Sequence, residues 1–135
     1  MAAATQARNT SQFAGEYLDL PVKGGVVIYA GTFVALDANG YAAPAAKAEG
    51  LIAAGRAEIT ANNRDGTDGD MNVRVARGVF KWDNDATNPV DIADVLKDCY
   101  MLDDCTVAAL ATGSSKAGKV LGIDQTDGSI LVETR

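Results

Sequence analysis

The stretch Asp91–Ala108, DIADVLKDCYMLDDCTVA, brings both cysteines, a pair of adjacent acids and two apolar runs into one short block. Its residue types predict four successive pieces. These are a short helical or turn segment over Asp91–Leu96, a strand over Cys99–Leu102, an acidic corner at Asp103-Asp104 and a second strand that begins at Thr106. Neighbouring residues of a strand point to opposite faces, so the two adjacent carboxylates are expected to cap backbone amides rather than share a catalytic site. The block is therefore interpreted as structural, not catalytic.

Just upstream, the segment Met71–Trp82 alternates apolar and polar residues as a half-buried strand requires. Met71, Val73 and Val75 share one face of this strand. The pair Arg77-Gly78 then shifts the register, and an aromatic stretch comes next that contains Phe80 and Trp82. The lone tryptophan is interpreted as an anchor, either of the core or of a subunit contact made together with Phe80.

Turn signals divide the rest of the chain into short strands. Asp37–Gly40, with its Asn-Gly pair, predicts a hairpin over Phe33–Tyr41, and Thr126–Gly128 predicts a second hairpin near the end of the chain. The run Gly50–Thr60 predicts a strand whose internal glycine marks a bulge or a close crossing. About eight or nine short strands with one short helical turn predict an all-β fold, a small barrel or sandwich.

Residues 1–20 differ from the rest of the chain, because small and polar residues dominate them and no periodicity persists. We interpret them as an extended N-terminal arm, and residues 21–135 as a single β-rich domain. On a partner surface the arm would bury its few large apolar side chains, which are Phe13, Tyr17, Leu18 and Leu20. An edge strand packed on the chain's own domain is an equally good interpretation of Glu16–Leu20.

Composition narrows the classes of partner. The chain has 135 residues and a net charge of −6, and it contains no basic cluster. Nucleic acid and anionic membrane surfaces are therefore not expected as partners, because both require concentrated lysine and arginine. No apolar run is long enough to span a bilayer, and the first residues lack the apolar centre of a secretory signal peptide, which predicts a protein that stays in the cytoplasm where it is made.

Few residues offer catalytic or metal chemistry. The chain has no histidine, which excludes a Ser-His or Cys-His nucleophile and leaves the cysteines without a usual co-ligand for a metal. We expect Cys99 and Cys105 to be buried small apolar residues, with a disulfide across the corner as the alternative. Gly113–Lys119 matches the first seven positions of a phosphate-binding loop, but Val120 replaces the required hydroxyl residue and a strand comes next instead of a helix.

Two motifs in the C-terminal half resemble a known family. The first is Ala93–Val107, ADVLKDCYMLDDCTV, and the second is Ala117–Asp124, AGKVLGID, which precedes a short terminal strand over Ile130–Glu133. They resemble the head decoration or capsid cement proteins of tailed bacteriophages, in which AD-x-x-K-x-CY-x-x-DD-x-TV precedes a variable polar loop and AG-x-V-x-G-x-D. The N-terminal half is similar to this family in composition only.

This resemblance implies a small β-barrel or β-tulip-like protein, a homotrimer in many members, that binds the phage major capsid protein on the capsid exterior. We therefore expect a non-enzymatic virion protein, without cofactors, that is made in the host cytoplasm and stabilises the shell. The apolar residues of the arm would supply the capsid contacts. Two alternatives remain open, another phage structural component such as a major head or tail-tube subunit, and a small enzyme or ligand-binding barrel.

Overall fold

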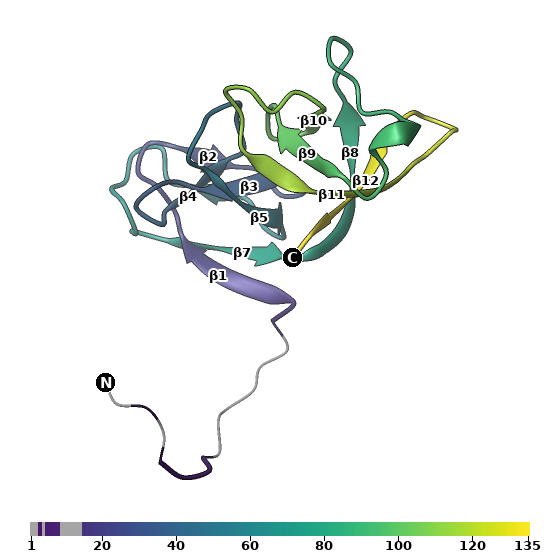
Figure 1. The fold of residues 1–135 in the computed structure, drawn as a ribbon. Helices are drawn as coiled ribbons and strands as arrows, with labels where there is room; N and C mark the ends of the chain where they lie inside the picture. The colour runs from purple at the N-terminus through teal and green to yellow at the C-terminus, as the bar shows by residue number, and fades with distance from the viewer. Residues whose placement is uncertain (1–2, 4, 9–14) are drawn as a thin grey trace.

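A computed structural model describes residues 3, 5–8 and 15–135, and in this part of the chain strands dominate (Figure 1). In chain order the strands are β1 (Tyr17–Pro21), β2 (Val27–Ile28), β3 (Phe33–Leu36), β4 (Ala42–Pro44), β5 (Ile52–Ala57), β6 (Ala61–Asn62), β7 (Asn72–Ala76), β8 (Gly78–Asn84), β9 (Asp98–Met101), β10 (Thr106–Ala108), β11 (Lys116–Ile123) and β12 (Ile130–Thr134). One 3-10 turn, η1 (Ile92–Asp94), precedes β9. The all-β fold class predicted from the sequence is confirmed.

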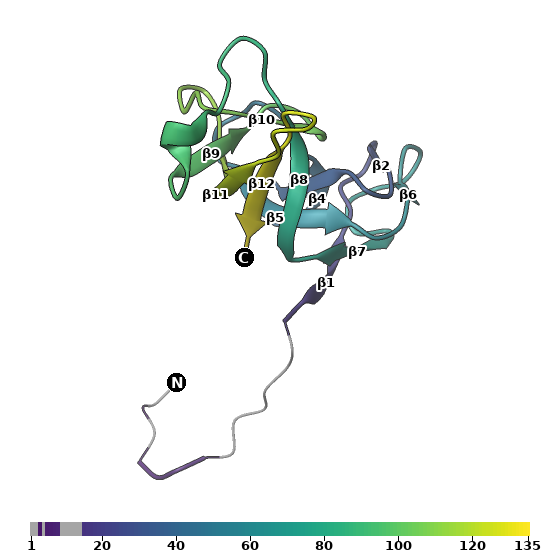
Figure 2. The same ribbon diagram turned by 90° about the vertical axis from the view of Figure 1, so that its right-hand side faces the viewer.

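The strands form an open sheet, a closed barrel and a short ribbon (Figures 1 and 2). The open sheet has the order β1-β7-β5-β3-β4, the barrel has the order β10-β8-β12-β11-β9, and β2 pairs with β6 in the ribbon. Parallel pairing of β10 with β8 closes the barrel, whereas every other strand pair in it is antiparallel. Only Arg77 separates β7 from β8, so the chain passes from the open sheet into the barrel at the register shift predicted there.

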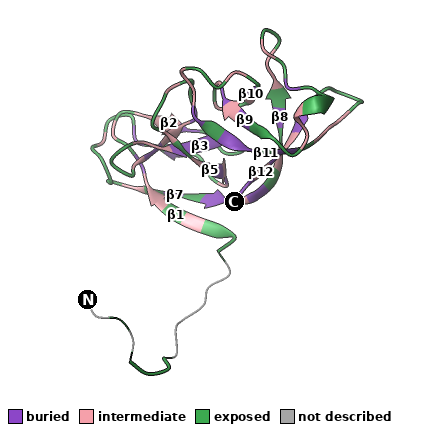
Figure 3. Ribbon diagram, viewed as in Figure 1, coloured by how far each residue is buried: buried purple, intermediate pink, exposed green. Residues whose placement is uncertain are grey.

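Two groups of buried side chains fill the fold (Figure 3). The barrel core contains Trp82, Met101 and Ile130 among others, and the second core lies on the open sheet around Val34 and Val73. β3 contributes to both, because Phe33 packs in the barrel core and its neighbour Val34 packs in the other. Successive residues of a strand point to opposite faces, so β3 joins the two cores.

Local sequence signals explain several of these elements. In β7, Val73 and Val75 are buried while Asn72 and Arg74 are exposed, as the alternating pattern predicted. The predicted hairpin joins β3 to β4, and the Asp37 carboxylate accepts hydrogen bonds from the backbone amides of Asn39 and Tyr41 at 2.9 and 3.0 Å. These amides, Tyr41 foremost, lower the pKa of Asp37. Each confirmed element therefore has a local cause in its own residues.

The block over Asp91–Ala108 has the structure predicted for it. Asp91 accepts a hydrogen bond from the Ala93 amide at 2.9 Å, and Asp94 accepts one from the Asp91 amide at 2.9 Å, which caps η1 at its start. β9 and β10 come next as an antiparallel pair. At the corner between them, the Asp103 carboxylate accepts a hydrogen bond from the Cys105 amide at 2.8 Å. Asp91, Asp94 and Asp103 are thus structural caps.

The N-terminal boundary differs from the arm interpretation. Residues 17–21 form β1, which pairs with β7 along its full length, and the Arg77 amide donates to the Glu16 carbonyl at 2.8 Å. Leu20 packs against the second core, because alternation in β1 directs it toward the sheet's buried face. Residues 17–20 therefore belong to the domain as an edge strand, the alternative that the sequence left open for Glu16–Leu20.

Candidate functional site

The edge strand β1 holds three of the four residues predicted to contact a partner. Tyr17 is 53% exposed, and the Arg74 guanidinium lies 5.4 Å from the centre of its ring. Leu18 and Leu20 are half-buried. Phe13 lies outside the described residues. Of the three described residues, only Tyr17 presents most of its side chain to solvent, whereas the leucines hold β1 on its sheet.

β1 is also the end of the open sheet, and in the described part of the chain no strand pairs with its outer edge. The described residues that precede it, which are Ala3, residues 5–8, Gly15 and Glu16, are exposed. In both ribbon views residues 5–8 lie away from the barrel (Figures 1 and 2). An unpaired strand edge exposes backbone donors and acceptors that another chain can use.

Trp82 lies in the interior, where its exposed fraction is 6%. Its ring stacks on Phe33 with a centroid distance of 4.8 Å and an interplanar angle of 18°. Among the described atoms, its indole nitrogen has no hydrogen-bond acceptor. Phe80 is half-buried and lies under the Arg56 guanidinium at 5.0 Å. Of the two roles proposed for Trp82, the core role is the one that this burial fits.

The two cysteines occupy different environments. Cys99 is fully buried, and burial raises the pKa of its thiol to about 12. Cys105 is exposed at the acidic corner, which corrects the expectation that both are buried, because a turn residue between two strands has no packed face. Partial burial and the nearby Asp104 carboxylate raise the pKa of Cys105. Neither thiol is bonded, so the disulfide alternative is not realised.

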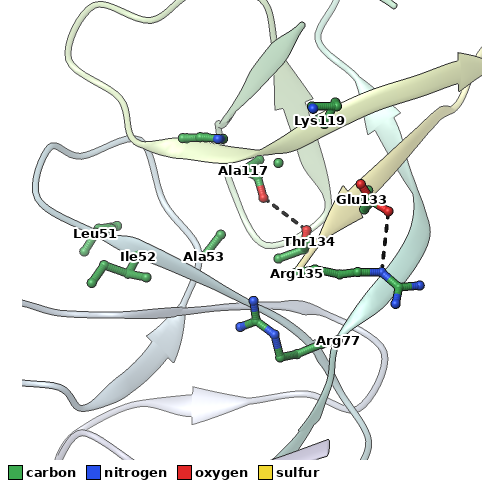
Figure 4. A pocket seen from close by; sticks show the side chains of 11 residues that line it. Leu51, Ile52, Ala53, Arg77, Ala117, Lys119, Glu133, Thr134 and Arg135 are labelled. Carbon is green, nitrogen blue, oxygen red and sulfur yellow. Dashed lines mark hydrogen bonds and ion pairs between the residues drawn. The ribbon is translucent and has the colours of Figure 1, made fainter. Parts of the chain in front are cut away.

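A pocket of about 530 Å³ opens where the start of β5 faces the barrel. Figure 4 shows Leu51, Ile52 and Ala53 on one side and Thr134 and Arg135 on the other, with Arg77 below and Lys119 above. Two hydroxyl groups position its walls. Ser115 donates to the Ala48 carbonyl at 2.6 Å and accepts from the Leu51 amide at 3.0 Å, while Thr134 donates to the Ala117 carbonyl at 3.0 Å.

Cationic side chains surround this pocket, which we call the basic pocket. Its lining includes four of them, Arg77, Lys116, Lys119 and Arg135, and one carboxylate, Glu133. Lys116 lies 3.3 Å from Asp98, and Arg135 lies 3.5 Å from Glu133. No described carboxylate lies within ion-pairing distance of Arg77 or Lys119. The basic pocket therefore carries positive charge within an acidic protein.

Sequence reasoning did not find the basic pocket, because its cations come from separate parts of the chain. Of the four cations, only Lys116 and Lys119 belong to a sequence motif, the segment that resembles a phosphate-binding loop. In the structure this segment enters β11 rather than a helix, so it has no helix N-terminus to hold a phosphate, as predicted. The lysines instead lie on β11, at the wall of the pocket.

A second pocket, of about 480 Å³, contains the acids Asp83, Asp85 and Asp127. The carboxylates of two of these acids accept hydrogen bonds within turns. Asp85 accepts from the Thr87 and Asn88 amides at 3.3 and 3.0 Å, and Asp127 accepts from the Ser129 hydroxyl at 2.6 Å, which lowers the pKa of Asp127. In the described part of the chain, no group of three or more cysteine, aspartate or glutamate residues is placed to hold a metal ion. Two of the three acids at this pocket therefore serve as caps of turns.

The described residues include no helix that is long and apolar enough to cross a membrane.

Comparisons with known proteins found no matching family model, no matching curated protein and no matching solved structure.

Proposed function

We propose that this protein is a non-enzymatic structural protein of a tailed-bacteriophage virion, which binds the capsid exterior as a homotrimer and stabilises the shell. The motifs within residues 93–124 and the small all-β barrel support this proposal. The observation that carries it is the edge strand β1. Its outer edge has no strand partner in the described part of the chain, and it directly continues the exposed residues that precede it.

The physical basis of such a role is the addition of weak contacts. An unpaired edge accepts an extended segment of another chain through backbone hydrogen bonds, and neighbouring side chains supply specificity. A trimer repeats each contact, so that modest single interfaces give strong total binding. In this proposal Tyr17 and Phe13 contact the shell, whereas Leu18 and Leu20 keep β1 on its own sheet.

The test is co-sedimentation with expanded shells assembled from the major capsid protein of the same genome. A chain that lacks residues 1–15 keeps β1, so it should retain the circular dichroism spectrum and unfolding temperature of the full chain, and it should bind shells more weakly because Phe13 is removed while Tyr17 remains. A chain that lacks residues 1–21 also loses β1 and exposes the second core, so it should be less stable. If removal of residues 1–15 leaves shell binding unchanged, the proposal for the N-terminal segment fails.

A point variant separates the contact from the fold. Tyr17→Ala should weaken pelleting with shells, because Tyr17 is the most exposed large residue of β1. Tyr29→Ala is the matched control, since Tyr29 is 55% exposed but lies outside β1. Equal effects of the two substitutions would contradict the proposed contact. A solution mass other than that of a trimer would contradict the oligomeric state, and rings or tubes formed by the isolated protein would favour the head or tail-tube alternative.

A further inference from the structure

We propose that the basic pocket is a docking site for an extended acidic segment of a partner protein. The inference goes beyond the proposed function, because it holds whether or not the partner is a capsid shell. It is carried by three observations on the same surface, which are an unpaired part of a strand, a concentration of cations and an exposed apolar side chain.

The unpaired part of a strand is the first half of β5. β5 pairs with β7 only at Arg56 and Ala57, and its pairing with β3 shifts register between Ala53 and Gly55. Ile52 and Ala53 therefore pair with β3 on one side and, in the described part of the chain, with no strand on the other. These two residues line the basic pocket (Figure 4). An extended peptide can add to such an edge as a further strand.

The positive charge around this edge favours a peptide that carries acidic residues. The chain has 12 lysines and arginines against 18 acids, yet four of those cations line this one pocket. Arg77 and Lys119 have no carboxylate partner among the described residues, so their charge is free to attract an anionic segment. Acidic residues elsewhere on the surface repel the same segment. Complementary charge of this kind increases the rate of encounter and fixes the orientation of the bound chain.

The arrangement favours a peptide over a single small anion. Arg77, Lys119 and Arg135 lie on different sides of the pocket rather than around one point (Figure 4). Ile52, which is 63% exposed, adds an apolar contact on the wall opposite Arg135 (Figure 4). The volume of about 530 Å³ accommodates several side chains. A segment that alternates acidic and apolar residues matches both the charges and the isoleucine, because its side chains alternate between faces.

The experiment measures the fluorescence anisotropy of a labelled synthetic peptide that alternates glutamate and valine, titrated with the full chain. We expect saturable binding that weakens as salt is added. Arg77→Glu and Lys119→Glu should each weaken binding by roughly tenfold. The matched control is Arg64→Glu, which makes the same charge change in an exposed loop outside the pocket and should leave the affinity unchanged. Unfolding temperatures of all three variants check that the fold persists.

A second readout locates the peptide. In a two-dimensional amide NMR spectrum, the peptide should shift the resonances of residues 51–53 and 116–119 and leave those of the distant loop at residues 62–70 in place. The proposal is overturned if the peptide does not bind at millimolar concentration, or if Arg64→Glu weakens binding as much as Arg77→Glu does. It is also overturned if free glutarate or a DNA oligonucleotide competes as well as the peptide does, because the site would then recognise negative charge alone.

Discussion

Replacement of Gly55 by alanine should destabilise the fold more than the same replacement at Gly31 or Gly118. Gly55 has φ +144°, which side-chain-bearing residues rarely adopt. A Cβ atom there would also collide with the carbonyl oxygen of Ala76 on β7 and approach Val75 Cγ1 at 3.1 Å. The position therefore combines backbone strain with a steric clash against another strand.

Two control variants separate these contributions. Gly31 has φ +85°, and no atom outside its chain neighbours lies within 4 Å of the place that a Cβ atom would take, so Gly31→Ala measures backbone strain alone, about 1–2 kcal/mol. Gly118 has no positive φ, but its Cβ would collide with the carbonyl oxygen of Glu133, so Gly118→Ala measures the clash alone, about 1–3 kcal/mol. Gly55→Ala should cost approximately their sum, about 2–5 kcal/mol. That is a large share of the roughly 5–15 kcal/mol that stabilises a typical domain.

Urea unfolding followed by circular dichroism measures all three variants under the same conditions. With a slope of about 1–3 kcal/mol per molar urea, the loss at Gly55 should lower the midpoint by about 0.7–5 M, and by about 2 M at the centre of both ranges. The reasoning is refuted if Gly55→Ala unfolds at the same midpoint as Gly31→Ala, because the contact with Ala76 would then cost nothing. It is also refuted if Gly118→Ala is as stable as the unmodified chain.

Two further predictions concern the core and the thiols. Trp82→Ala should lower the free energy of unfolding by about 3–5 kcal/mol, and Trp82→Phe by less than half as much, since a phenyl ring still stacks on Phe33 and the indole nitrogen has no acceptor to lose. Equal losses in urea unfolding would contradict this. Iodoacetamide at about pH 8 should modify Cys105 and spare Cys99, whose pKa is raised to about 12, and the rate at Cys105 should still rise above about pH 9 because its own pKa is raised. Mass spectrometry checks both sites, and modification of Cys99 in the folded protein would contradict the prediction.

Those parts of the fold that depend on local chemistry could be predicted from the sequence. Alternation over residues 71–76 predicted β7, the Asp37–Gly40 turn predicted the hairpin of β3 and β4, and the acids at residues 91–94 fit the capped turn η1. Each of these signals acts within a few residues. Side-chain alternation and backbone capping leave a direct trace in a short stretch of sequence.

Long-range pairing could not be predicted in the same way. The barrel closes because β10 lies parallel to β8, and β1 joins the domain because it pairs with β7, about fifty residues further along the chain. Strand edges have similar backbone donors and acceptors, so local sequence does not specify which edges meet. The exposure of Cys105 could not be predicted either. A residue at a corner is exposed or buried according to which other segments pack over the corner.

The candidate sites show the same contrast between local sequence signals and long-range strand pairing. The apolar residues of β1 were identified from composition, but whether they point toward the sheet or the solvent depends on pairing with β7. The basic pocket was not identified at all, because Arg77 and Arg135 meet Lys116 and Lys119 only after the barrel has closed. A search for basic clusters along the sequence misses a cluster whose members lie far apart in the chain.

The basic pocket and the stability of the fold depend on the same feature of β5. Gly55 lies against Ala76 of β7 just before Arg56, where the pairing of β5 with β7 ends, and Ile52 and Ala53 beyond it have no partner on β7. The single residue between β7 and β8 then places the Arg77 side chain at this opening. Gly55→Ala should therefore disturb both stability and peptide binding, whereas Arg77→Glu should disturb binding alone. A variant pair with this pattern would show that the strand separation creates the site and that the charge selects its ligand.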